Sequence, residues 1–303
     1  MKIILVGQGP FGEKVLEALI QKGEEVVGTF SPPDKRGEPL KILAEKSGIP
    51  FFRPNLMKNP QIYDAYLNLQ PDLAILAFVT DIIPEKLLAV PSLGTICYQP
   101  SILPRHRGAS AINWAIIQGD TRTGLTILWV DKGIDTGPIL LQKEIEISPD
   151  ETTGSLYFNT LFAMGVNAMV EAVELIKTGK ASRIPQDESR ATYEPPCDDR
   201  VASVSFDKSI KGIYNLIRGC DPQPGAYTML KGRRVRFYDA KMSPSVIEKQ
   251  PGEILSIEGG ALQIAVKGGV IQVGKIRVDK GEKIGPVEFA KLVDVKIGDR
   301  FGK

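Results

Sequence analysis

Residues 1–30, MKIILVGQGPFGEKVLEALIQKGEEVVGTF, contain the pattern that decides the fold class. Residues 3–6 are apolar throughout, as in a strand that is buried on both faces. Residues 11–22 carry apolar side chains at helical spacing and stop before Gly23, a residue type common just beyond helix ends. Residues 25–30 have the character of a second strand. A strand, a helix and another strand in so short a span predict a βαβ unit with a parallel sheet.

The same alternation continues along the first part of the chain. Further strands are predicted at residues 73–79, 95–98 and 125–130, and helices at residues 40–46, 109–118 and 155–177. Residues 183–204 are rich in proline and charge and have no period, which is typical of a linker. Beyond them a helix is predicted at residues 210–218, followed by strands at residues 226–230, 235–238, 253–257, 262–266 and 270–273. We therefore predict an α/β, Rossmann-like domain with a largely parallel sheet over residues 1–185, a linker over 186–203, and a small β-barrel over 204–303.

Composition limits the other possibilities. The chain has 303 residues, 43% of them hydrophobic, and a net charge of +2, so a large core is possible and no partner is required by charge alone. Its three cysteines are widely spaced and it has one histidine, a pattern that favours no metal site. We expect no signal peptide, no stretch approaching the ~20 apolar residues of a membrane span, no membrane partner and a cytoplasmic location.

Gly7, Gly9 and Gly12 form a GxGxxG pattern between the first strand and the first helix. The pattern is compatible with a dinucleotide site, but such a site also needs an acidic residue at the tip of the second strand, and Asp34 lies beyond two prolines. A tight turn that packs the helix close to the sheet is the favoured interpretation.

Two polar loops follow predicted strands. The first is CYQPSILPRHRGAS, residues 97–110, and the second is DKGIDTGPIL, residues 131–140. In an open parallel sheet, ligands bind beyond the carboxyl ends of the strands, so both loops are expected to face one crevice, with Asp135 near Gln99.

The long motifs around these loops carry a family resemblance. YQPSILPRHRGASAINWAIIQGD, followed by TGLTILWVDKGIDTGPILLQKEIEISPDET, resembles the formyltransferases that use 10-formyltetrahydrofolate. This family includes methionyl-tRNA formyltransferase and the hydrolase domain of 10-formyltetrahydrofolate dehydrogenase. The resemblance extends from GQGPFG to the closing VKIGDRFG. It implies a Rossmann-like domain that binds the folate co-substrate and a C-terminal barrel similar to an OB fold, with no metal.

The resemblance also assigns site residues. The segment Ser101, Ile102, Leu103 and Pro104 matches the tetrahydrofolate-binding segment, and Asp81, Ile82 and Ile83 match a second folate-contacting segment. Asp135 matches the family's essential aspartate, which also lies in the folate site. Gln99 stands where the family has its catalytic histidine, and Cys97 stands where many members have an asparagine. The two positions closest to the chemistry therefore depart from the family pattern.

The chemistry shows what this departure means. An amine or water adds to the formyl carbon, the formyl oxygen becomes negative, and a proton must reach the leaving nitrogen. The Gln99 amide can donate a hydrogen bond to that oxygen but cannot carry a proton at neutral pH. Asp135 remains available as a base. We therefore expect one-carbon transfer that is impaired or altered.

Three functions remain open. The acceptor is methionyl-tRNA, or it is water or a small amine, or the protein is a folate- or NAD-binding module without turnover. Methionyl-tRNA formyltransferases usually carry a longer, basic insertion after the second strand, whereas the corresponding segment here, residues 31–48, is short and modestly charged, which disfavours tRNA as acceptor. The basic stretch KGRRVRFY at residues 231–238 is either an RNA contact or a charged edge strand. His106 is expected to pack within its loop, and Arg105 and Arg107 either steer an anionic substrate or are solvated.

Overall fold

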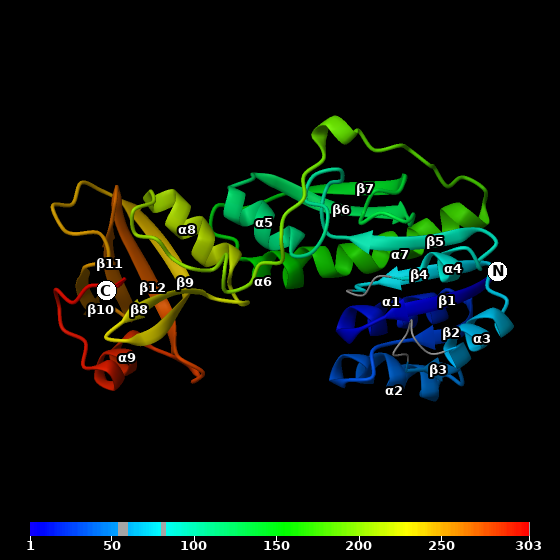
Figure 1. The fold of residues 1–303 in the computed structure, drawn as a ribbon, viewed down its shortest axis with the longest axis horizontal. Coiled ribbons are helices and arrows are strands. Elements are labelled where there is room, and N and C mark those ends of the chain that lie inside the picture. Colours follow the sequence, from blue (N-terminus) through cyan, green and yellow to red (C-terminus); the bar gives the residue numbers. More distant parts are fainter. Residues whose placement is uncertain (54–59, 80–82, 303) are drawn as a thin grey trace. The chain divides into compact units, whose positions relative to one another are not determined.

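The structure is a computed structural model that describes residues 1–53, 60–79 and 83–302 (Figure 1). By contact, the chain divides into two compact units. The first comprises Met1–Ala111, Gly124–Ile145 and Phe158–Glu194, and the second comprises Ile112–Thr123, Glu146–Tyr157 and Pro195–Lys303. Because a division by contact does not test where a domain can fold alone, the boundaries at residues 185 and 204 stay a prediction.

The first unit contains a sheet of seven strands in the described residues. Its strands are β1 (Lys2–Gly7), β2 (Glu25–Phe30), β3 (Phe51–Phe52), β4 (Leu73–Ala77), β5 (Gly94–Gln99), β6 (Arg122–Trp129) and β7 (Ile139–Glu146). Figure 1 shows them in the order β3-β2-β1-β4-β5-β6-β7. The pairs from β3 to β5 are parallel, and β6 is antiparallel to β5. The prediction of a largely parallel sheet is confirmed.

Alternation along β1 explains how both faces of this sheet are covered. Ile3 and Leu5 belong to a core cluster with residues of α1 (Gly9–Gln21), α2 (Glu38–Lys46) and α7 (Phe162–Lys177). Ile4 and Val6 belong to the cluster on the opposite face. That cluster includes residues of α3 (Pro60–Asn68) and α4 (Glu85–Leu88). Because successive strand side chains point to opposite faces, one apolar run supplies both cores.

The glycine-rich turn after β1 packs closely. A Cβ on Gly12 would lie 3.0 Å from the Gly7 carbonyl carbon, and one on Gly7 would lie 3.3 Å from the Ala77 oxygen. Larger residues would push α1 away from the sheet. The interpretation of Gly7 and Gly12 as packing residues is confirmed.

A long helix runs from α6 (Thr153–Leu156) through the π-helical turn η2 (Tyr157–Leu161) into α7. By length and composition, Thr153–Lys177 could cross a membrane, contrary to our expectation that no such stretch exists. One face of α7, including Ala168, Met169 and Ala172, is buried in the core of the first unit. A core helix passes the same test, so this finding is weak evidence for a membrane span.

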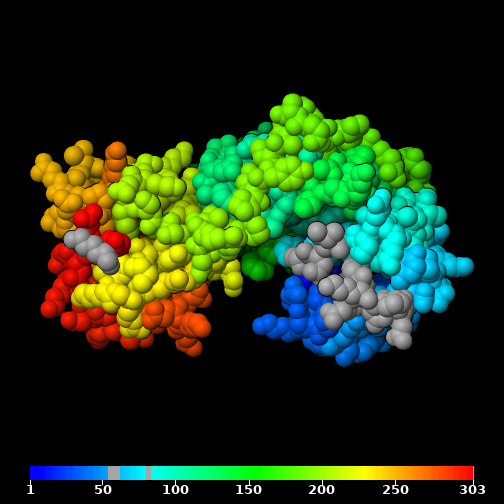
Figure 2. Space-filling model, viewed as in Figure 1, coloured from blue at the N-terminus to red at the C-terminus, as the bar shows by residue number. Residues whose placement is uncertain are grey.

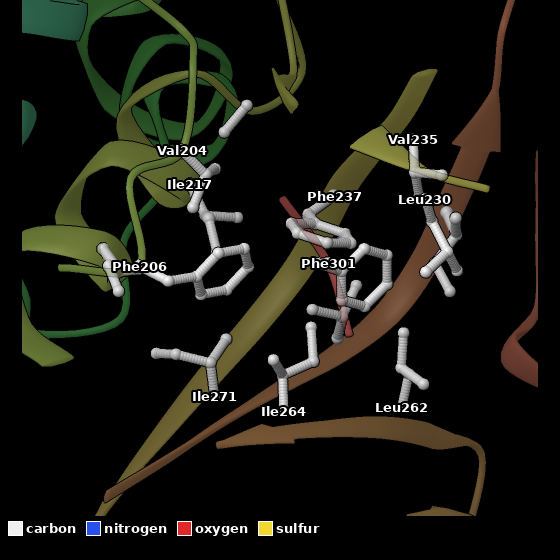
Figure 3. Packing of buried hydrophobic residues seen from close by; sticks show 14 of the residues in the cluster. Val204, Phe206, Ile217, Leu230, Val235, Phe237, Leu262, Ile264, Ile271 and Phe301 are labelled. Atoms are coloured by element: carbon white, nitrogen blue, oxygen red, sulfur yellow. The ribbon is translucent and has the colours of Figure 1, made fainter. Parts of the chain in front are cut away.

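The second unit contains an antiparallel sheet, consistent with the predicted barrel. Its strands are β8 (Ala226–Leu230), β9 (Arg233–Pro244), β10 (Ile254–Glu258), β11 (Ala261–Val266), β12 (Gly269–Val278) and β13 (Lys283–Ile284), in the order β10-β11-β12-β9-β8 with β13 beside β12. Its helices include α5 (Ala111–Gln118), α8 (Ile210–Gly219) and α9 (Pro286–Val293). Figure 3 shows its aromatic core, in which the rings of Phe237 and Phe301 meet edge to face with centroids 5.2 Å apart.

The basic stretch at residues 231–238 lies mostly in β9. This strand pairs with β8 on one side and β12 on the other, so the expectation of a charged edge strand is wrong. Arg236 is 8% exposed, and its Nη2 donates to Asp199 Oδ1 at 2.7 Å. The RNA-contact interpretation stays a prediction.

Candidate active site

Gln99 is the last residue of β5, and its side chain holds the loop that follows. The side chain is buried, and its Nε2 donates to the carbonyl oxygens of His106 and Gly108, at 3.1 Å each. Both amide hydrogens are thus used inside the protein. The expectation that they donate to a formyl oxygen does not fit this geometry, in which Gln99 fixes the loop.

The Asp135 carboxylate meets the same loop at Gly108, one of the two residues that Gln99 contacts. Its Oδ2 accepts a hydrogen bond of 2.7 Å from the Gly108 N–H. Gly108 has φ of 89°, a backbone conformation that favours glycine, and Asp135 itself lies in the left-handed region at φ 55°. Gln99 and Asp135 therefore contact opposite ends of one residue, and their predicted proximity is confirmed.

The electrostatic setting of Asp135 suits proton transfer. Burial raises the pKa of its carboxyl above the usual value, and the Gly108 N–H and the charge of Arg107 partly oppose that shift. A carboxylate with a raised pKa binds a proton more readily, which makes it a stronger base.

The reason we gave for this proximity is wrong. Because β6 is antiparallel to β5, Trp129 at the end of β6 pairs with Ile96 near the beginning of β5. The loop that contains Asp135 therefore starts at the amino end of β5, not at a shared carboxyl edge. Asp135 meets Gly108 because the loop after Gln99 folds back to it.

Arg107 is buried beneath the site, with 1% of its surface exposed. Its guanidinium donates to Gln186 Oε1 at 2.7 Å, to Glu188 Oε1 at 2.6 Å and to the Tyr193 hydroxyl at 3.0 Å. Neither expectation for Arg107, that it steers a substrate or is solvated, is correct. Arg105 is exposed, and its steering role stays a prediction.

Gln186 connects this arginine to the aspartate loop. Its Oε1 accepts from Arg107 Nε and Nη2, at 3.1 and 2.7 Å, while its Nε2 donates to the carbonyls of Asp135 and Gly137, at 2.8 and 2.7 Å. One amide side chain thus holds both loops together. The unusual backbone conformation of Asp135 is fixed in this way.

The segment predicted as a linker completes the site. His106 N–H donates to Thr192 Oγ1 at 2.8 Å, and its Nδ1 lies 3.2 Å from Glu194 Oε1. His106 is 3% exposed, so its expected packing role within the loop fits the structure. Figure 2 shows yellow-green residues from this part of the chain at the surface. Tyr193 is 56% exposed. Sequence reasoning missed Gln186, Glu188, Thr192 and Tyr193, because no local period marks them.

Cys97 lies within β5 and packs against the core cluster that contains Ile4. Burial, and secondarily the charge of Asp135, raise the pKa of its thiol well above the usual value. The thiol therefore stays protonated at neutral pH, and a protonated thiol is a poor nucleophile.

The predicted folate segment is a rigid part of the loop. Ser101, Leu103 and Pro104 are buried, and Ile102 is partly exposed. The Leu103 N–H donates to Thr126 Oγ1 at 3.2 Å. Direct folate contact by the four residues stays a prediction. Of the second predicted segment, Asp81 and Ile82 lie outside the described residues, and Ile83 packs against the core.

Metal ligation is not suggested by the described part of the chain. It contains no group of three or more histidine, cysteine, aspartate or glutamate side chains that could hold an ion. Among the described residues, the Asp135 carboxylate is a group of this site that can exchange a proton.

Fold and site together define a class, that of a Rossmann-like α/β unit with polar loops around a half-buried aspartate, accompanied by a small β unit. The sequence profile described as "Formyl transferase" matches residues 1–173, and "Formyl transferase, C-terminal domain" matches residues 198–293. The chain belongs to the formyl transferase family, a family of transferases, as the motifs predicted.

Individual relatives span two kinds of enzyme. The human mitochondrial 10-formyltetrahydrofolate dehydrogenase is 43% identical over 282 residues, which are 90% of this chain and 30% of that protein. The chain thus spans about a third of the length of such dehydrogenases. The methionyl-tRNA formyltransferase of Geotalea daltonii is 33% identical over 310 residues, which are 100% of this chain and 98% of that protein.

A solved structure confirms the fold. HypX from Aquifex aeolicus in complex with tetrahydrofolic acid superposes with a TM-score of 0.72 at 20% identity, over 99% of this chain and 48% of that one.

Proposed function

We propose that this chain binds 10-formyltetrahydrofolate and passes its one-carbon unit to an acceptor, with Asp135 as the group that handles the proton. The observation that carries the proposal is the shared contact at Gly108: its N–H binds Asp135 and its carbonyl accepts from Gln99. Asp135 and Gln99, two positions to which the family resemblance assigns chemistry, thus both contact Gly108.

The proton inventory of the reaction assigns the roles. An amine or water adds to the formyl carbon and must lose a proton, while the folate nitrogen must gain one when the C–N bond breaks. Asp135 can accept the first proton, directly or through water, and return it to the leaving nitrogen, a contribution of about 10²–10⁴ in rate. No covalent intermediate with the protein is required.

Gln99 makes this a slow member of its family. Its amide hydrogens are bound to two loop carbonyls, and it cannot exchange a proton at neutral pH. If a donor to the developing oxyanion is lost, the rate falls by about 10²–10³. Gln99 is therefore a positioning residue in this proposal.

The acceptor has two supported candidates. The 43% identity to a 10-formyltetrahydrofolate dehydrogenase favours water or a small amine as acceptor. The alignment with a methionyl-tRNA formyltransferase along nearly all of both chains keeps initiator tRNA as the second candidate. A module that binds folate or NAD without turnover is the remaining alternative.

The decisive experiment follows the one-carbon unit after incubation with 10-formyltetrahydrofolate, alone and with candidate amines or methionyl-tRNA. We expect slow transfer by the natural sequence, a gain of about 10²-fold in Gln99→His, and loss of that gain when Asp135→Asn is added. If no transfer is found, calorimetry with a folate analogue and with NAD shows which of the two ligands the protein binds. Failure of the folate analogue to bind, or a Gln99→His variant with no gain, would count against the proposal.

A further inference from the structure

Two of the three cysteines lie side by side in the second unit. Cys197 Sγ and Cys220 Sγ are 3.7 Å apart, although 23 positions separate them in the chain. Cys220 is fully buried, and Cys197 is partly exposed. A disulfide needs an S–S distance of about 2.05 Å, so the sulfurs would have to approach by about 1.7 Å.

The local structure permits that approach. Cys220 is the C-cap residue of α8, where the regular helix ends. Cys197 lies between prolines and a turn, in a stretch outside any helix or strand. Its neighbour Asp198 makes local turn bonds, such as the 2.9 Å bond from the Arg200 N–H, whereas Asp199 is ion-paired with Arg234 and Arg236 of β9. A shift of Cys197 itself toward Cys220 would break no sheet ladder, although it has to occur beside the anchored Asp199.

The two thiols differ in a way that suits sequential chemistry. The contact with Cys220 lowers the pKa of the Cys197 thiol despite its partial burial. The same contact, together with burial, raises the pKa of Cys220. Cys197 is thus the exposed and more easily ionised member, and Cys220 is its buried partner.

We propose that Cys197 and Cys220 form a reversible redox site that a peroxide oxidises to an intramolecular disulfide. The Cys197 thiolate attacks one peroxide oxygen, the O–O bond breaks, and Cys197 becomes a sulfenic acid as water leaves. The Cys220 sulfur then attacks the Cys197 sulfur, the S–O bond breaks, and a second water carries away the hydroxyl and the remaining thiol proton. One peroxide is reduced and two thiols are oxidised, and a dithiol reductant reverses the reaction.

The disulfide would clamp α5. The Nε1–H of Trp114 donates to the Pro195 carbonyl at 2.7 Å, and Nδ2 of Asn113 donates to the Gly219 carbonyl at 2.7 Å. Each of these carbonyls lies within two residues of one of the thiols. Joining the sulfurs therefore ties together the two segments that hold α5.

The test treats the full chain with hydrogen peroxide, blocks the remaining thiols and maps the peptides by mass. We expect one linked peptide pair containing Cys197 and Cys220, lost after treatment with dithiothreitol. Cys197→Ser should abolish the pair, while the matched variant Cys97→Ser should keep it. Because Cys197 is only partly buried, we expect Cys197→Ser to disturb the fold less than Cys220→Ser.

Two results would overturn the inference. One is oxidation of Cys197 to sulfinic acid without any linked peptide, and the other is linkage that involves Cys97 or a second molecule. Hydrogen exchange tests the clamp separately: the amides of α5 should exchange several-fold more slowly in the oxidised chain. Unchanged exchange in a fully linked sample would overturn the clamp on α5.

Discussion

Replacing Gln186 by leucine should destabilise the first unit more than any ordinary surface change. Leucine has a similar volume but removes the two bonds to Arg107 and the two to the carbonyls of Asp135 and Gly137. Each neutral bond contributes about 1 kcal/mol, and each bond to a charged group about 1.5 kcal/mol or more. Arg107 would also remain buried with unpaired N–H groups. Since such terms are not additive, we expect a loss of about 3–5 kcal/mol in the free energy of unfolding.

Fluorescence can isolate this effect. In a Trp114→Phe background, the buried Trp129 of β6 is the one tryptophan that remains and reports on the first unit during urea unfolding. The control is Gln21→Leu, an exposed position at the end of α1, where we expect a change within about 0.5 kcal/mol. A Gln186→Leu variant that loses less than about 1 kcal/mol would refute the idea that this amide holds the two loops.

Three further perturbations follow from the site. Burial raises the pKa of the Asp135 carboxyl in the folded state above its value in the unfolded chain. The protonated carboxyl therefore stabilises the fold fully at pH values below the unfolded-state pKa, and this stabilisation is lost as the pH rises through the folded-state pKa. Urea midpoints of Asp135→Asn should therefore match the natural sequence at low pH and exceed it near neutral pH; an equal gap at all pH values would contradict this. In Gly137→Ala the new Cβ would lie 1.7 Å from the Trp129 carbonyl oxygen, so a loss of about 1–3 kcal/mol or more is expected, whereas Gly285→Ala, which has open space, should change little. Gln99→Glu turns two amide donors into a carboxylate that faces two carbonyl oxygens, and thermal melting should show a loss of about 2 kcal/mol or more; a stable variant would argue against those bonds.

The sheet was predictable because its strands carry the pattern that burial demands. The strand at residues 25–30 was predicted with the bounds that the structure gives, and the strand at residues 3–6 lacked only its end residues. β7 was missed, although its residues alternate between buried and exposed as in a half-buried strand, because the apolar run at its start was interpreted as part of the loop over residues 131–140. Apolar periodicity reports which face a residue occupies, and it carries no information on strand direction, so the reversal at β6 was not predicted.

The candidate site was predicted only in part, because some of its residues lie in motifs and others do not. Gln99 and Asp135 could be brought together from loop composition and the family motifs, although the topological argument was wrong. Gln186 could not be assigned to the site from the sequence, because the residues that it contacts lie 49 to 79 positions away in the chain. A glutamine in a proline-rich stretch has no local feature that marks it as the connection between two distant loops.

The burial of Arg107 has a consequence for biosynthesis. The groups that neutralise and bind this guanidinium follow it in the chain by 79 to 86 positions. A ribosome that adds about 5–20 residues per second needs roughly 4–17 s to produce them. During that interval the nascent chain holds a positive charge that cannot yet enter the interior, so the active-site loops can mature only after most of the first unit has been synthesised.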